Sequence, residues 1–306
     1  MSGIDSQPTV TIGLAVRNGA ASLDGAIDCL SRQTHRNLRI IISDNESTDE
    51  TSAICEKWIR RDSRIGYVRQ SKNLGAVLNF HFLLSQADSP YFMWAAHDDD
   101  WSPDYIQANL EVLASQPDVV CSVSKVELLD VPALPVPLIP GTDPLVDDQQ
   151  SNLVEYLREP GANSRIYGLY RTDDLKQSFF ATDTYWAFDW AIVARTLMRG
   201  KHALVPRTLM RRRCRGESSD AELNIRRFNP SWLSHRFPML PFTMALLADK
   251  SIPKTYPVLK SLFRWNHVYL KNSIRSFKHR SIYPLLEAAR LRAPRPTTRS
   301  STRAVA

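Results

Sequence analysis

Short apolar runs alternate with amphipathic segments along the first 130 residues of the chain. Each apolar run is bounded by polar or turn-forming residues, a pattern typical of buried strands, and apolar residues recur at helical spacing between the runs. This alternation predicts an α/β fold with a mostly parallel, Rossmann-like sheet flanked by helices. The predicted strands are residues 10–16, 39–43, 65–69, 91–96 and 119–128, and helices are expected to begin near Ser22, Ser47, Gly75 and Pro103.

Residues that are common at helix N-termini indicate where the helices begin. Ser22 precedes an apolar helical face, as an N-cap residue does. Ser47 is followed three residues later by Glu50, which is the spacing of a capping box. Pro103 is expected in the first turn of the next helix, because proline fits that position.

The pattern changes after residue 128. Residues 130–150 contain five prolines and one glycine, and so long a loop is usually functional or mobile. Strand-like and helix-like segments resume over residues 152–213, and from about residue 228 the chain is predicted to be helical with breaks at prolines. The last dozen residues are expected to be disordered.

Composition is that of an ordinary globular protein, with 306 residues, 43% apolar and 23% charged. No apolar stretch is long enough to span a bilayer, and the first ten residues lack the features of a secretory signal. The four cysteines are scattered and form no CxxC pair. This usage favours the reducing cytoplasm and argues against a zinc ribbon.

The net charge of +7 is concentrated near the C-terminus. Residues 251–306 hold twelve Lys or Arg and one acid, a balance of +11, which leaves −4 for the remainder. Two interpretations are open: this basic helical segment contacts the inner face of the plasma membrane peripherally, or it docks on the protein's own core. Its aromatic residues lie at helical spacing and argue against a nucleic-acid partner. One helical face would carry Lys260, Arg264, Lys271, Arg275 and Lys278, beside an apolar stripe of Leu259, Leu262, Phe263, Leu270, Ile274 and Phe277.

Acidic residues follow two of the predicted strands. Asp98, Asp99 and Asp100 come directly after the strand at 91–96, and Asp44 follows the strand at 39–43. Ligands of open α/β sheets bind at the carboxyl ends of strands, and adjacent carboxylates attract a hard divalent cation. A solvated acidic turn is the alternative, and the triplet alone does not decide between the two.

Glycine-rich phosphate loops are missing from the expected places. No GxGxxG follows the first strand and no GxxxxGK[ST] occurs, which argues against nicotinamide dehydrogenases and P-loop NTPases. The turn at residues 17–19 has only one basic residue and one glycine. A nucleotidyltransferase usually has a glycine-rich, basic phosphate loop at this place, so the turn argues against that class. Arg69 and the turn Asn73-Leu74-Gly75 precede a helix N-terminus, where an anion such as a pyrophosphate is favoured.

Four segments in order resemble family-2 nucleotide-sugar glycosyltransferases with the GT-A fold. They are VTIGLAVRNGAASLDGAIDCLSRQT (10–34), IIISDNESTDET (40–51), NLGAVLN (73–79) and FMWAAHDDDWSPDYI (92–106). The resemblance implies a GT-A domain over residues 1–220 and a helical basic extension over residues 221–306. Within the domain, residues 8–128 would bind the nucleotide sugar and residues 150–218 the acceptor.

The resemblance also implies roles for single residues. Asp44 would contact the nucleobase, Asp98 the ribose or the metal, and Asp99 the metal, Mn²⁺ or Mg²⁺. Asp100 is interpreted as a solvated acid of the first helical turn. The remaining donor-binding residues would be Val16, Asn18, Arg69, Asn73 and Gly75.

In the acceptor half, Asp189 resembles the catalytic aspartate, flanked by Phe188 and Trp190. Such an apolar setting raises a carboxyl pKa and suits a general base. Asp183 is interpreted as a turn residue. Cys214 stands where related sequences often have a metal-binding histidine, so nearby Arg212, Arg213 and Arg215 are alternative partners for the diphosphate.

The expected function is inverting transfer of a sugar from a UDP- or dTDP-sugar to a hydroxyl of a glycan or lipid-linked acceptor in cell-envelope synthesis. A cytoplasmic protein is expected. The alternative is a non-catalytic nucleotide-sugar or glycan-binding protein on the same fold.

Overall fold

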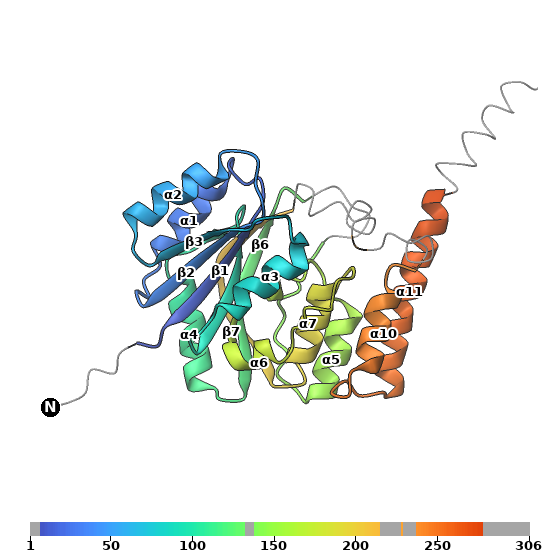
Figure 1. Cartoon of the computed structure of the whole chain (residues 1–306). Coiled ribbons are helices and arrows are strands. Elements are labelled where there is room, and N and C mark those ends of the chain that lie inside the picture. Colours follow the sequence, from blue (N-terminus) through green and yellow to red (C-terminus); the bar gives the residue numbers. More distant parts are fainter. Residues whose placement is uncertain (1–6, 132–137, 215–227, 229–236, 278–306) are drawn as a thin grey trace, which may run out of the picture.

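Figure 1 shows the computed structural model, which describes residues 7–131, 138–214, 228 and 237–277. Eight strands form one sheet in the order β3-β2-β1-β4-β7-β6-β8-β5. The strands are β1 (Val10–Val16), β2 (Leu38–Asp44), β3 (Ile65–Arg69), β4 (Tyr91–Ala96), β5 (Asp100–Trp101), β6 (Val119–Leu129), β7 (Leu169–Arg171) and β8 (Lys201–Arg213). The helices are α1 (Leu23–Ser31), α2 (Thr51–Arg61), α3 (Gly75–Ser85), α4 (Tyr105–Ser115), α5 (Gln149–Arg158), the 3₁₀ helix η1 (Ser164–Tyr167), α6 (Thr172–Lys176), α7 (Phe188–Thr196), α10 (Leu240–Ala248) and α11 (Tyr256–Phe277).

The predicted mostly parallel sheet is confirmed. Strands β1 to β4 are parallel, and β6 is parallel to β8. Antiparallel pairing is restricted to β7, between β4 and β6, and to the short edge strand β5 on β8. The parallel strands therefore end together at one edge of the sheet, where ligands of open α/β sheets bind.

Two helix starts differ from the sequence prediction. The capping box at Ser47 is wrong, because α2 begins at Thr51 and its N-cap residue, Glu50, makes no side-chain cap bond. The Ser47 hydroxyl instead accepts from the Asn18 amide at 2.8 Å. Pro103 lies before α4, which begins at Tyr105.

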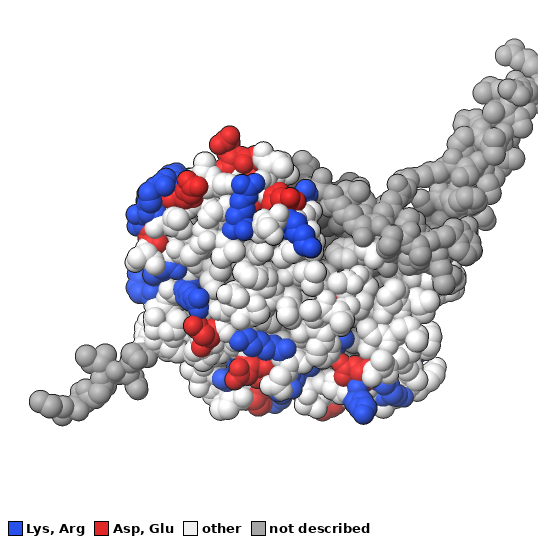
Figure 2. Space-filling model, viewed as in Figure 1, with Lys and Arg blue, Asp and Glu red and all other residues white. Residues whose placement is uncertain are grey.

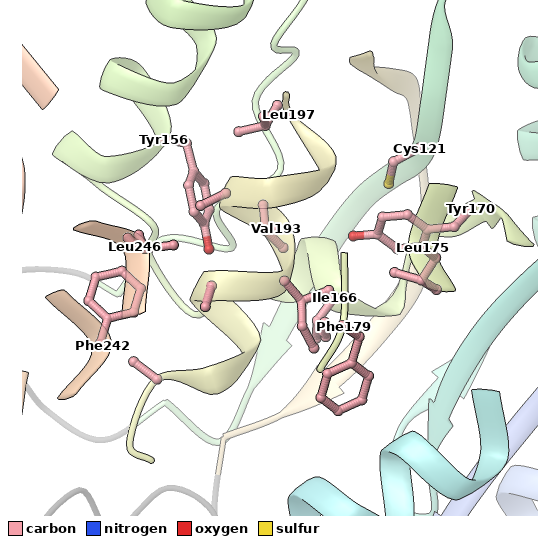
Figure 3. Packing of buried hydrophobic residues seen from close by; sticks show 14 of the residues in the cluster. Cys121, Tyr156, Ile166, Tyr170, Leu175, Phe179, Val193, Leu197, Phe242 and Leu246 are labelled. Carbon is pink, nitrogen blue, oxygen red and sulfur yellow. The ribbon is translucent and has the colours of Figure 1, made fainter. Parts of the chain in front are cut away.

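Two apolar cores lie on opposite faces of the sheet. One packs α1, α2 and α4 against the strands. The other joins α3, α5 and α7 with α10 and α11, and Figure 3 shows its centre between α5 and α7. Helices covering both faces keep the parallel strands out of water, as such sheets require.

The start of α11 docks on this second core, as one of the two interpretations anticipated. Val258 and Leu262 are fully buried, and the Trp265 indole donates to the Leu157 carbonyl at 2.6 Å. The predicted apolar stripe is rotated, since Phe263 is 56% exposed. No helix among the described residues could cross a membrane, and Lys278 and the final dozen residues lie outside them.

Charged side chains of both signs are mixed on the face drawn in Figure 2. They gather along its upper and lower rims, and a broad area between these rims is uncharged. The described residues of this face thus form no single-sign patch of the kind that nucleic-acid binding uses.

Candidate donor-sugar site

The carboxyl ends of β1, β2 and β3 bring three predicted donor-binding residues side by side. Val16 pairs in register with Asp44, and Asp44 with Arg69. The Asp44 carboxylate is fully buried. It accepts from the Ser47 amide at 2.8 Å and from the Tyr67 hydroxyl at 3.0 Å, while Arg69 Nε lies 3.9 Å from its Oδ2. Asp44 is thus a fixed acceptor at the strand ends.

The turn after β1 closes over this edge. Asn18 has a left-handed backbone, with φ of 51°, which asparagine tolerates. Its side-chain oxygen accepts from the Thr48 amide at 2.8 Å and so joins the turns after β1 and β2. A side chain at Gly19 would come within 2.5 Å of Val16 and 3.0 Å of His97, so this position has no room for one.

In the turn between β3 and α3, the backbone amides of residues 73–75 are bonded to side chains of the protein itself. The Asn73 amide donates to Glu46, and the Gly75 amide donates to the Asn73 side chain at 2.9 Å. The Leu74 amide donates to Asn45 Oδ1 at 2.7 Å. These amides already have acceptors and Glu46 adds negative charge, so the geometry favours Asn73 and Gly75 as residues that shape the turn before α3. It does not favour the expected pyrophosphate site at this helix N-terminus.

The acidic triplet separates into three environments. Asp98 is half-buried, whereas Asp99 is only 2% exposed. Asp99 Oδ1 accepts from the Arg213 amide at 3.0 Å, and Oδ2 is buried with no partner among the described atoms. Asp100 was predicted to start a helix, but it lies in β5 opposite Arg211, and its carboxylate is 3.7 Å from Arg213.

Burial raises the pKa of Asp99 to about 7, with Arg212 acting against the rise and Asp98 adding to it. A buried carboxylate with an unpartnered oxygen fits a divalent cation, which would supply the missing partner. Among the described residues no three His, Cys, Asp or Glu side chains form a metal cage. At this edge the triplet offers Asp99, which is buried, and the neighbouring Asp98, which is half-buried.

The end of β8 lies between the two halves of the site. Arg212 donates to the Ala162 carbonyl and to Ser164 Oγ at 3.3 Å, and its guanidinium is 5.0 Å from the centre of the Tyr167 ring. Burial disfavours its charge, but Tyr167, Asp99 and Asp189 outweigh that effect and raise the pKa of Arg212. Arg212 is thus a fixed cation close to both acids.

Cys214 offers little as a metal ligand. It is buried, its sulfur lies 3.9 Å from the Arg212 carbonyl, and burial raises the pKa of its thiol. A neutral thiol binds Mg²⁺ poorly. Arg215, the other proposed diphosphate partner, lies outside the described residues.

Asp189 lies in the first turn of α7. Its Oδ2 accepts from Asn163 Nδ2 at 2.8 Å. Burial raises the pKa of Asp189, although the bond from Asn163 and the charge of Arg212 lower it. Asp183, interpreted from the sequence as a turn residue, is buried and forms an ion pair with Arg195, which also binds Asp249 at 2.8 Å.

Sequence reasoning missed Asn163 and its partner Tyr156, whose hydroxyl donates to Asn163 Oδ1 at 3.0 Å. The only signal was the Gly161-Ala162-Asn163 turn, a sequence that suits left-handed backbone. A hollow of about 770 Å³ lined by Cys29, Trp101 and Arg211 contains none of the predicted donor-site residues, so it is not part of this site.

Solved structures share this fold and carry nucleotide sugars. The structure of S. aureus TarS residues 1–349 with UDP-GlcNAc aligns with a TM-score of 0.61 at 13% identity, covering 89% of this chain and 73% of that one. The mannosyltransferase PcManGT from Pyrobaculum calidifontis with GDP-Man and Mn²⁺ aligns with a TM-score of 0.59 at 16% identity, covering 94% and 81%. The fold is therefore GT-A, the architecture of a class of glycosyltransferases.

Sequence comparison finds a family similarity in the N-terminal part of the chain. Residues 11–136 match the family model described as glycosyl transferase family 2. An uncharacterized glycosyltransferase of Rickettsia typhi is 30% identical over 106 residues, covering 35% of this chain and 32% of the relative. TuaG of Bacillus subtilis, named for teichuronic acid biosynthesis, is 27% identical over 107 residues, covering 35% and 42%.

The N-terminal part of the chain, residues 11–136, is thus similar in sequence to glycosyl transferase family 2, and the fold agrees with that similarity. The match spans about a third of the length of the Rickettsia relative.

Proposed function

We propose that this protein is an inverting glycosyltransferase that moves a sugar from a nucleoside-diphosphate sugar to a hydroxyl acceptor. One observation carries the proposal: adjacent residues of β8 link the two acids that this chemistry needs. The Arg213 amide binds Asp99 at 3.0 Å, and Arg212 binds Ala162 and Ser164, the residues on either side of the Asp189 partner Asn163. A donor site and a base are thus held by one strand end.

The donor half supports a nucleoside diphosphate. We propose that the buried carboxylate of Asp44 accepts from a base. Val16 and Arg69 flank it in register, and the Asn18 amide donates to the Ser47 hydroxyl beside it. Uridine and thymidine carry a ring N–H that a carboxylate can accept, so we propose a UDP- or dTDP-sugar. Arg212 would take up part of the diphosphate charge.

A divalent cation, Mn²⁺ or Mg²⁺, would be held by Asp99 and Asp98. When bound it supplies Lewis-acid stabilisation of the leaving nucleoside diphosphate. Asp99 is preorganised for this role, because its Oδ1 is held by a backbone amide while its buried Oδ2 has no partner among the described atoms.

Asp189 would act as the general base. It takes the proton from the acceptor hydroxyl while that oxygen attacks the anomeric carbon from the face opposite the diphosphate. The new carbon–oxygen bond forms as the bond to the diphosphate oxygen breaks, which inverts the anomeric centre. Burial raises the Asp189 pKa toward the operating pH, as suits a base.

The decisive experiment replaces Asp189 by Asn and measures sugar transfer and donor binding separately. We expect transfer to fall by roughly 10²–10⁴-fold, the usual contribution of general-base catalysis, while donor affinity stays near wild type. Asp173→Asn is the matched control, because Asp173 is also a first-turn helix acid but is exposed.

If Asp189→Asn kept wild-type turnover while correctly folded, the base assignment would be wrong. If the wild type bound nucleotide sugars but neither transferred nor hydrolysed them, the protein would be the non-catalytic binder. Screening UDP- and dTDP-sugars by thermal shift with Mn²⁺ or Mg²⁺ identifies the donor first.

We further propose that the acceptor is a glycan or lipid-linked glycan of the cell envelope, reached at a membrane surface through residues 251–306. Two features support this surface. On α11, Phe263 and Tyr256 are 56% and 75% exposed. Lys260 and Lys271 are exposed on the same helix as Phe263, a mixture that suits an anionic bilayer.

A further inference from the structure

Three side chains from three segments form a hydrogen-bonded chain that ends at Asp189. Tyr156, on α5, donates from its hydroxyl to Asn163 Oδ1 at 3.0 Å, and Asn163 Nδ2 donates to Asp189 Oδ2 at 2.8 Å. Tyr156 is 3% exposed and Asn163 is 1% exposed. Figure 3 shows Tyr156 reaching into the space between α5 and α7.

When Asp189 is ionised, the donor and the acceptor of each of these two hydrogen bonds are fixed. A carboxylate accepts hydrogen bonds and donates none, so the Asn163 amide must present its NH₂ group to it. The Asn163 oxygen then faces Tyr156, which must donate. Without the tyrosine hydroxyl, the Asn163 oxygen loses its donor, and only the bond to Asp189 orients the amide. The amide can then turn its oxygen toward Asp189 when that carboxyl group is protonated, which favours the protonated form.

The backbone around Asn163 is held in place from both sides. Asn163 has a left-handed φ of 48°. Its amide donates to the Pro160 carbonyl at 3.0 Å, and its carbonyl accepts from the Ile166 amide at 3.1 Å. The neighbouring Ala162 carbonyl accepts from Arg212. These bonds fix the position of the Asn163 backbone, and thus the position from which its side chain extends.

We propose that Tyr156 and Asn163 are positioning residues for Asp189: they orient its carboxylate through Oδ2 and favour its ionised form. The proton of the acceptor hydroxyl would then go to the other carboxylate oxygen. This inference rests on the proposed role of Asp189 as the base and names the residues that prepare it.

The surroundings of Asp189 agree with this role. Burial raises the pKa of Tyr156 from α5, Tyr167 from η1 and Tyr269 from α11, and the charge of Asp189 adds to the rise, so all three stay neutral. Arg212 from β8 brings a positive charge, which lowers the pKa of Asp189 together with the bond from Asn163. Arg212 stays in place in the variants below, so their effect reports the hydrogen-bonded chain.

The test is the pH profile of transfer by Tyr156→Phe. Removing the hydroxyl frees the Asn163 amide, weakens the bond that lowers the Asp189 pKa, and thus raises that pKa. A base works only when deprotonated, so activity should be lost mainly on the acid side. We expect kcat/KM to fall roughly tenfold more at pH 6 than at pH 9 relative to wild type.

Tyr170→Phe is the matched control. Tyr170 belongs to the same core, and its buried hydroxyl donates to the Arg165 carbonyl at 2.8 Å, away from Asp189. Its pH profile should follow that of wild type. If Tyr156→Phe does not fold, Asn163→Gly removes both hydrogen bonds while tolerating the left-handed backbone, and the same acid-side loss is expected.

The outcomes separate the two proposals. If wild type is active and Asp189→Asn is not, but Tyr156→Phe and Asn163→Gly lose activity equally at all pH values, the positioning role is refuted and Asp189 remains the base. If Asp189→Asn is fully active, the proposed function has failed first.

Discussion

Asp99 is the residue on which donor binding should depend most. Its carboxylate is buried, one oxygen is held by the Arg213 amide, and the other has no partner among the described atoms. Asp100, one residue on, is partly exposed and lies 3.7 Å from the Arg213 guanidinium. Neighbouring acids of one triplet thus lie in different environments.

We expect Asp99→Asn to weaken binding of UDP or dTDP in the presence of Mn²⁺ at least about tenfold, because an amide is a poorer ligand for a hard cation than a carboxylate. Isothermal titration calorimetry with and without Mn²⁺ measures this effect. Asp100→Asn is the control and should bind as wild type does. Equal Mn²⁺-supported affinity in Asp99→Asn and wild type would remove the metal role from this residue.

At the residue scale, the sequence singled out the candidate acids but not the residues that contact them in the fold. Asp44, Asp99 and Asp189 stand at strand or helix ends, where position in an element points to a role. Tyr156 and Asn163 lie 33 and 26 residues before Asp189. Only tertiary packing brings them to it. The Gly161-Ala162-Asn163 turn indicates a left-handed backbone, but no local pattern indicates the contact with Asp189.

At the scale of elements, strands were predicted better than helix starts. The ranges at 10–16, 65–69 and 91–96 match β1, β3 and β4, because buried apolar runs have few alternatives. The capping box failed because Ser47 serves the donor-site turn and binds Asn18 and Asp44. Ser47 makes these contacts in the turn after β2 and therefore does not cap α2.

Helix α7 is tied to the segment after α10 by Arg195, which binds both Asp183 and Asp249 in a largely buried cluster. Arg195→Met would leave two carboxylates without their cation. Removing one partner of a buried ion pair costs about 3–5 kcal/mol, and urea unfolding measures that loss. Arg199→Met is the control. Its ion pair with Asp174 is more exposed, and we expect a loss of at most about 1 kcal/mol.

For the whole molecule, alternating strands and helices were enough to predict a layered α/β fold. The antiparallel placement of β7 between β4 and β6 was beyond the sequence, because a three-residue strand has too few residues to show a pattern. The sequence also could not decide whether α11 docks on the protein. A helix with one basic face can expose that face to water or to a membrane while its other face packs on a protein core.

Docking and membrane contact are compatible, because they use different sides of α11. Val258 and Leu262 face the core, whereas Lys260, Phe263 and Lys271 are exposed. If the outer side meets anionic lipid, each lysine contributes about 1 kcal/mol, and replacing both by glutamate should weaken binding by roughly 30-fold or more.

Sedimentation with vesicles of phosphatidylcholine with and without phosphatidylserine tests this expectation on the full chain carrying Lys260→Glu and Lys271→Glu. The control carries Arg36→Glu and Arg60→Glu, an equal charge change at exposed positions near α1 and α2, which Figure 1 places across the molecule from α11. Loss of binding in the first variant alone would locate the contact on α11. Equal binding by both variants and wild type would exclude this surface, and equal loss in both would indicate a response to net charge, against a specific lipid-facing side.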